Sequence, residues 1–164
     1  MTKWVGTVTQ AEAAAEVMRK AFKTAQTERP GATAVIVPED VSAAPSQARP
    51  LKINLPRDTE PSSDQLKRAM ALLATAKNPI VLADPGVARD HAEAALQRFA
   101  EALDLPVATT FAGKGVLPAD HANALGTIGF MEHDYSNFGF DAADQVIAIG
   151  YDLGCSQERD FFVR

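Results

Sequence analysis

A glycine-containing turn follows two adjacent threonines in the stretch from Pro106 to Pro118. Thr109 and Thr110 stand at the end of a short apolar run, and Gly113 and Gly115 then flank a lysine. Loops that leave the tips of parallel strands expose backbone N–H groups, which bind anions and nucleotides. The stretch therefore predicts part of a ligand-facing rim, although a plain tight turn would explain a glycine pair equally well.

The other residue types that could do chemistry form no recognisable site. Lys114 could meet a phosphate, but a solvated turn lysine is the commoner case. The three histidines, His91, His121 and His133, lack the spacing of metal ligands, and we interpret them as structural or solvent-exposed. Cys155 has no adjacent basic residue to favour its thiolate. Adjacent acids on loops usually face solvent, so we assign no pair to acid–base catalysis.

The composition indicates which cellular compartment to expect and which classes of partner to exclude. The 164 residues carry a net charge of −5, with 46% hydrophobic and 23% charged residues. This acidic balance, without a basic face interleaved with aromatics, argues against a nucleic-acid partner. No apolar run approaches the roughly 20 residues of a membrane span, and the first residues do not form a signal peptide. One cysteine cannot form an internal disulfide, so we expect a cytoplasmic protein.

The first forty residues predict one helix and one strand. Thr9 and Glu12 are spaced as a capping box, and apolar residues at helical spacing follow from Ala14 to Ala25. The continuous apolar run from Ala34 to Val37 is typical of a parallel strand buried on both faces. Residues 1–6 are too short a segment to assign.

The composition changes between Val41 and Ser63. Four prolines among polar residues predict an extended connection there. One helix and one strand cannot bury both of their faces alone, so the residues before the connection should be the end of a larger domain. We therefore expect residues 1–41 to be the C-terminal end of one domain, 42–61 a linker, and 62–164 part of a second domain.

Helices and strands alternate after the linker. Residues 62–65 predict a second capping box, for a helix whose apolar face is Leu66, Ala69, Met70, Leu73 and Ala76. A further helix from Asp90 to Leu103 should bury Ala92, Leu96, Phe99 and Leu103. Continuous apolar runs predict buried strands at Pro79 to Ala83, Val107 to Thr109 and Gln145 to Ile149.

This order of elements predicts an α/β fold with a doubly wound parallel sheet. The carboxyl ends of the strands should then share one edge. That edge would carry the segments Asp84 to Val87, Thr109 to Gly115 and Gly150 to Asp152.

Several segments, taken in order, resemble thiamine-diphosphate enzymes, most closely acetolactate synthase and its relatives. RPGATAVIVPEDV, residues 29–41, resembles the end of that family's pyrimidine-binding domain. PIVLADPGVAR, LPVATTFAGKGVLPADH, LGTIGF and ADQVIAIGYDL resemble its Rossmann-like central domain. The resemblance implies descent from a carboligase that decarboxylates pyruvate and condenses the product. It ends near Leu153, since residues 154–164 depart from the pattern and two further strands of the family are not recognisable.

The resemblance places the family's catalytic centre in other segments. There, a glutamate of the pyrimidine-binding domain activates thiamine diphosphate, and a GDG…N motif of a third domain holds Mg²⁺. Neither feature occurs in this sequence. We therefore expect a truncated piece without catalytic or metal-binding residues, whose partners are the remaining domains of the same enzyme in a homo-oligomer. A stand-alone nucleotide-binding (FAD- or ADP-like) or structural module of the same fold is the alternative.

The resemblance also names candidate cofactor-binding residues, because biosynthetic members hold FAD in the central domain. An arginine that those members carry after the last matching strand is replaced here by Tyr151 and Asp152. An acid at that place would repel a diphosphate by ~1 kcal/mol or more at a few ångströms. IGYD resembles instead the catabolic members, so FAD is allowed but not favoured. The matching positions are Gly86, Val87, Thr109, Thr110, Gly113, Gly115, Gly126, Thr127 and Gly129.

Overall fold

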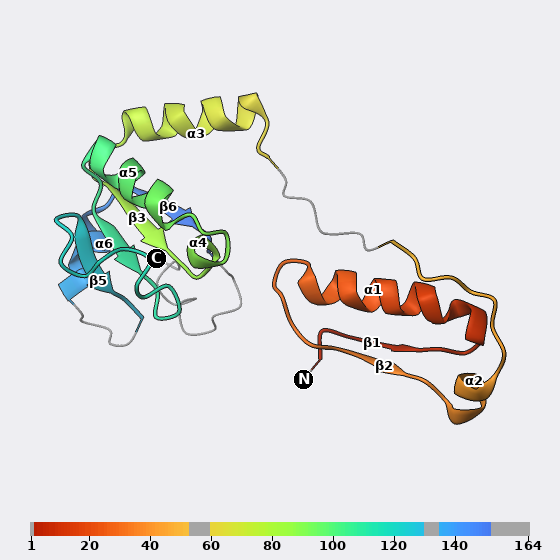
Figure 1. Ribbon diagram of the computed structural model, residues 1–164. Coiled ribbons are helices and arrows are strands. Elements are labelled where there is room, and N and C mark those ends of the chain that lie inside the picture. The colour runs from red at the N-terminus through yellow and green to blue at the C-terminus, as the bar shows by residue number, and fades with distance from the viewer. Residues whose placement is uncertain (1, 53–59, 130–134, 152–164) are drawn as a thin grey trace. The chain divides into compact units, whose positions relative to one another are not determined.

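The computed structural model describes residues 2–52, 60–129 and 135–151 (Figure 1). These residues fall into two compact units, which we call the first unit (Met1–Glu60) and the second unit (Pro61–Arg164). His133, Asp152 and Cys155 lie outside the described residues. So do residues 154–164, which we expected to depart from the family's sequence pattern.

The first unit is a β-α-β arrangement. Strands β1 (Trp4–Thr7) and β2 (Thr33–Ile36) pair in parallel, with Trp4 opposite Thr33. Helix α1 (Ala14–Gln26) connects them after one turn of 3-10 helix (Ala11–Ala13). The Thr33 hydroxyl donates to the Ala21 carbonyl at 3.2 Å, which ties one face of the strand pair to α1.

Three expectations for the first unit are wrong. The expected capping box of Thr9 and Glu12 does not form. The first helical turn is a 3-10 helix whose N-cap is Gln10, and no side chain caps it, since β1 extends the chain up to Thr7. The β2 strand is not buried on both faces: Ile36 is 53% exposed, since α1 is tied to one face of a two-stranded sheet. Helix α2 (Glu39–Ala43) occupies the start of the expected extended connection.

The second unit contains a four-stranded sheet with the order β5-β4-β3-β6, in which every neighbouring pair is parallel. The predicted α/β class and the shared direction of three predicted strands are therefore confirmed. The strands are β3 (Pro79–Ala83), β4 (Val107–Thr109), β5 (Ala124–Thr127) and β6 (Gln145–Ile149). The helices are α3 (Ser63–Thr75), α4 (Gly86–Arg89), α5 (Glu93–Leu103) and α6 (Tyr135–Ala142).

The sheet has a core on each face, as a doubly wound fold requires. Alternate residues of a strand point to opposite faces. Val81 and Val107 belong to a cluster with Leu96 and Ala100 of α5. Leu82 belongs to the other cluster, against which Phe140 of α6 packs. The continuous apolar runs of β3 and β4 are explained by this coverage of both faces.

Strand β5 was not expected from the sequence. Its register with β4 shifts between Val107 and Ala108, so that Leu125 is an extra residue and Ala108 faces Gly126. Gly126 has a φ of 99°, a conformation that glycine adopts without the cost of a side chain. A bulged strand of this kind has no continuous apolar run to reveal it.

The helices of the second unit follow the sequence only partly. The Ser62 capping box of α3 is confirmed: Ser62 Oγ accepts from the Gln65 N–H at 3.3 Å, and Gln65 Oε1 accepts from the Ser62 N–H at 2.8 Å. No residue of α3 is buried, and Met70 on its apolar face is 57% exposed. Helix α5 begins at Glu93 rather than Asp90, because the short helix α4 and a turn come first. Leu103, at the end of α5, is exposed instead of buried.

Candidate functional site

Three loops meet at the carboxyl edge of the second unit's sheet. Since β3, β4 and β6 are parallel neighbours, the residues that follow each of them lie side by side. The Asp84 N–H donates to the Ile149 carbonyl at 3.0 Å, and the Thr110 N–H donates to the Ala83 carbonyl at 3.0 Å. Strand β3 therefore aligns the loops on both of its sides.

A buried side-chain network joins the first two loops. Asp84 and Thr110 are 1% and 0% exposed, and the Thr110 hydroxyl donates to Asp84 Oδ1. The same hydroxyl oxygen accepts from the Gly113 N–H at 3.0 Å. A Cβ at Gly113 would lie 2.6 Å from the Ala83 carbonyl oxygen, so the loop after β4 passes too close to β3 for any side chain at this position. The sequence analysis placed Asp84 at this edge but did not predict its buried hydrogen bond with Thr110.

The loops that follow β3 and β6 contact each other through two glycines. The Gly86 N–H donates to the Gly150 carbonyl at 3.1 Å. A Cβ on Gly86 would lie 2.6 Å from the Gly150 Cα, and Gly150 itself has a φ of 64°. The strand order reverses direction between β3 and β6, where open α/β sheets usually leave a crevice for a ligand. Here the backbones of Gly86 and Gly150 contact each other at that position.

The last candidate residues lie along β4 and β5. The hydroxyl oxygens of Thr109 and Thr127 are 3.1 Å apart and hydrogen-bonded, and the Ile128 N–H donates to the Thr109 carbonyl at 2.9 Å. Gly115 and Gly129 both have a φ of 99°. A Cβ at Gly115 would meet nothing within 4 Å, so the conformation of the turn, rather than close packing, requires a glycine there.

The polar groups of this carboxyl edge largely bond one another. The N–H groups of Gly86 and Gly113 and the hydroxyls of Thr109 and Thr110 all have partners within the edge. A diphosphate bound to these particular groups would have to displace such bonds. Lys114 is exposed on the turn between the two glycines. The arrangement is a rim of three loops joined by hydrogen bonds and close backbone contacts.

The described residues contain neither a metal-binding cluster nor a membrane-spanning helix. In residues 2–52, 60–129 and 135–151, no group of three or more histidine, cysteine, aspartate or glutamate side chains is placed to hold a metal ion. Over the same residues, no helix combines the length and the apolar character that crossing a membrane would need.

At the opposite edge of the sheet, where the strands begin, Asp144 joins β6 to the residues that precede β3. Its carboxylate accepts from the backbone N–H groups of Lys77 and Asn78, at 2.7 and 2.9 Å. These hydrogen bonds, from Lys77 first and then Asn78, lower the pKa of Asp144 below its usual value. Lys77 and Asn78 lie 67 and 66 residues before Asp144 in the chain, so the spacing of residues did not reveal this contact. A cavity of about 450 Å³ lies at this same edge, between Asn78, Leu103, Leu105 and Leu125.

Comparison with known proteins gives a consistent set of relatives. Residues 66–161, more than half of the chain, match the family model described as thiamine pyrophosphate enzyme, central domain. A Methanococcus aeolicus protein named "Probable acetolactate synthase large subunit" is 35% identical over 144 residues, which are 82% of this chain and 24% of the relative. The glyoxylate carboligase of Escherichia coli O157:H7 is 34% identical over 156 residues, covering 92% of this chain and 26% of the relative.

A solved structure supports the fold. Benzoylformate decarboxylase from Polynucleobacter necessarius superposes with a TM-score of 0.72 at 22% identity, over 90% of this chain and 28% of that chain. The chain thus spans about a quarter of the length of the curated relatives it matches. The family match continues to residue 161, so the expected departure from the pattern after Leu153 is wrong for most of that segment.

Proposed function

Because the chain belongs to the thiamine pyrophosphate enzyme family, whose central domain it contains, we propose that it serves a carboligase of acetolactate synthase type. Such an enzyme decarboxylates pyruvate and condenses the product with a second carbonyl compound. The observation that carries the proposal is the identity of 35% with a relative named as an acetolactate synthase large subunit, over 82% of this chain. In this proposal, residues 1–41 end a pyrimidine-binding domain, 42–61 connect it, and 62–164 form part of the central domain.

The role of the chain's own residues is structural. The Asp84, Thr110 and Gly113 network and the contact of Gly86 with Gly150 hold three loops in one rim. Thiamine diphosphate with Mg²⁺, held by other domains of the parent enzyme, supplies the decarboxylation chemistry. FAD is not favoured, since the rim's own hydrogen bonds compete with it. The remaining domains of the enzyme and further copies of it, in the cytoplasm, are the proposed partners.

The first test asks whether the catalytic centre lies outside this chain. The purified chain is given pyruvate, thiamine diphosphate and Mg²⁺, and acetolactate is measured against a protein-free control. We expect no acetolactate above that control. Acetolactate formation that depends on thiamine diphosphate would contradict the proposal.

The second test asks whether the chain can do the proposed structural work. Residues 61–164 replace the matching segment of the Escherichia coli acetolactate synthase isozyme 3 large subunit, a relative that is 32% identical. We expect a folded chimera that still makes acetolactate. A folded chimera of native size without any activity would speak against the assignment, and tight FAD binding by the isolated chain would favour the nucleotide-binding alternative.

A further inference from the structure

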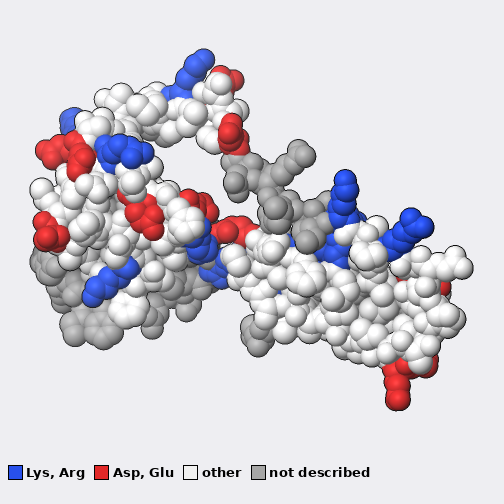
Figure 2. Space-filling model, viewed as in Figure 1, with Lys and Arg blue, Asp and Glu red and all other residues white. Residues whose placement is uncertain are grey.

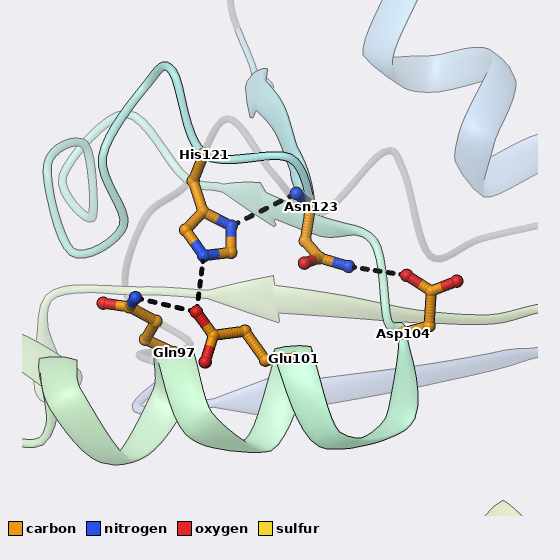
Figure 3. Close-up of polar contacts among 5 residues, drawn as sticks. All are labelled: Gln97, Glu101, Asp104, His121 and Asn123. Carbon is orange, nitrogen blue, oxygen red and sulfur yellow. Dashed lines mark hydrogen bonds and ion pairs between the residues drawn. The ribbon is translucent and has the colours of Figure 1, made fainter.

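A polar cluster joins helix α5 to the connection between β4 and β5 (Figure 3). His121 Nε2 lies 3.1 Å from Glu101 Oε1, and His121 Nδ1 accepts from the backbone N–H of Asn123 at 3.2 Å. The side chain of Gln97 donates to the same Glu101 oxygen at 2.8 Å. The side-chain amide of Asn123 donates to Asp104 Oδ1 at 3.2 Å. Two residues of the connection are thus bound to Glu101 of α5 and to Asp104 at its C-terminal end, and Gln97 supports Glu101.

The contacts of His121 fit one neutral tautomer of the imidazole ring. An imidazole nitrogen that accepts a hydrogen bond carries a lone pair, so Nδ1 is unprotonated when the Asn123 N–H points at it. The neutral ring then carries its proton on Nε2, which donates to Glu101. The side chain is only 13% exposed, so the ring has little room to turn away from both partners.

The cluster sits where β5 begins. The Ala124 N–H donates to the His121 carbonyl at 2.9 Å, and the Val107 N–H donates to the Asn123 carbonyl at 2.8 Å. This turn therefore determines where β5 starts beside β4. Strand β5 is the outer strand of the described sheet and carries a bulge, and such segments open more easily than central strands.

We propose that His121 is a proton-operated latch on β5. Neutral His121 holds the Asn123 backbone, whereas a proton taken from water onto Nδ1 places two donors face to face and breaks that bond. The contact with Glu101 survives as an ion pair. Among the described residues, three carboxylates belong to or adjoin the cluster: Glu101 touches the ring, Asp104 bonds Asn123, and Asp120 precedes His121 in the chain. Protonation then removes one of the hydrogen bonds that order the turn before β5, while the bonds of Ala124 and Val107 to the backbone of this turn remain.

Amide hydrogen exchange followed by NMR tests the latch on the chain as it is. Histidine changes charge between about pH 5 and 8, so exchange is measured across that range and corrected for the intrinsic pH dependence. We expect protection of the Asn123 amide to fall about fivefold on protonation, which corresponds to losing one ordinary hydrogen bond. The midpoint should match that of the His121 ring proton shifts. Unchanged protection while the ring titrates would overturn the proposal.

Two variants and one control sharpen the test. In His121→Asn, a side-chain oxygen can still accept from the Asn123 N–H but cannot titrate, so protection should persist at both ends of the range. In Glu101→Gln, the ring loses its anionic partner but can still take up a proton, so the pH-dependent loss of Asn123 protection should persist. His91→Asn is the control, because His91 is exposed with a φ of 52°, which asparagine tolerates. The proposal would be refuted if the Asn123 amide still lost protection at low pH in His121→Asn. It would also be refuted if this loss disappeared in His91→Asn.

Discussion

Single residues determine how closely the loops of the rim approach one another. Gly113 is the clearest case, because its Cα faces the backbone of Ala83 and Asp84 with no room for a methyl group. The same residue donates to the buried Thr110 hydroxyl. Displacing it disturbs both the packing and the network that contains Asp84.

We expect Gly113→Ala to destabilise the second unit by about 1–3 kcal/mol, the usual cost of overpacking a closely packed site. Chemical denaturation of the chain measures this. Gly139→Ala serves as the control, since its Cβ would meet only the methyl ends of Ile80 and Leu125, at 3.3 Å, and helices favour alanine. Equal stability of the two variants would show that the loop after β4 can move aside.

Asp144 makes stability depend on pH through its lowered pKa. A carboxylate with a lowered folded-state pKa stabilises the fold above its ordinary value of 3.8, and this contribution is lost as the pH falls through the lower folded value. Asp144→Asn should therefore reduce thermal stability at neutral pH and show a smaller further loss in acid than the original protein.

Thermal unfolding recorded from about pH 7 to pH 2 measures the Asp144 effect. Asp141→Asn is a suitable control, because Asp141 is an exposed aspartate in the same part of the chain. An acid transition that is identical with and without Asp144 would contradict the predicted linkage.

At the scale of elements, α3 depends on its own local interactions more than the other helices do. None of its residues is buried, whereas α5 buries Leu96 and Ala100. A helix of this length gains little from propensity alone, so the capping box has a large share in keeping it folded.

We therefore expect Ser62→Ala to weaken α3 by about 1 kcal/mol, a typical cost of removing an N-cap. The loss should appear as faster amide exchange within α3 and leave the protection of β3 and β4 unchanged. Ser63→Ala is the control, because Ser63 is the first residue inside the helix and alanine is favoured there. Parallel loss of protection in α3 and the sheet would mean that the helix is coupled to the core.

At the scale of the whole molecule, apolar surface remains uncovered in both units. Phe22 on α1 is 55% exposed, and Val5, Met18 and Ile36 of the same unit are also exposed. Figure 2 shows that the face of the first unit turned toward the viewer is largely uncharged. Strand β6 lies at an edge of the described sheet, where unpaired backbone groups can join another chain.

These surfaces predict self-association, for which we expect Phe22→Asp to raise the dissociation constant about tenfold or more. The estimate follows from the roughly 1.5–3 kcal/mol gained by burying a phenylalanine side chain. Light scattering over a concentration series measures the change, with Gln26→Asp as a control of equal charge change at an exposed site of α1. A compact monomer at high concentration would contradict the expectation, and unchanged association in Phe22→Asp would implicate the β6 edge.

Local patterns in the sequence were sufficient for the central strands, for one helix cap and for the family. Continuous apolar runs predict β3 and β4 as buried strands because strands covered on both faces need apolar side chains at every position. The run at β6 also predicts a strand, but its expected burial is wrong: none of its residues is buried, since it lies at an edge of the described sheet. The Ser62 capping box was predictable because its partners lie three residues apart. The order of the short segments around the glycines indicated the family that the comparison then showed.

Tertiary structure alone decided the features that join distant parts of the chain. Strand β5 forms only beside β4 and with a bulge at Leu125. Gly86 and Gly150 come into contact only when β3 and β6 pair. Asp144 bonds backbone groups that precede β3, far from it in the sequence. Tertiary structure also decided that Thr9 does not cap a helix and that the apolar face of α3 is not buried. Spacing along a chain shows which contacts are possible locally, whereas long-range contacts depend on how separate elements pack.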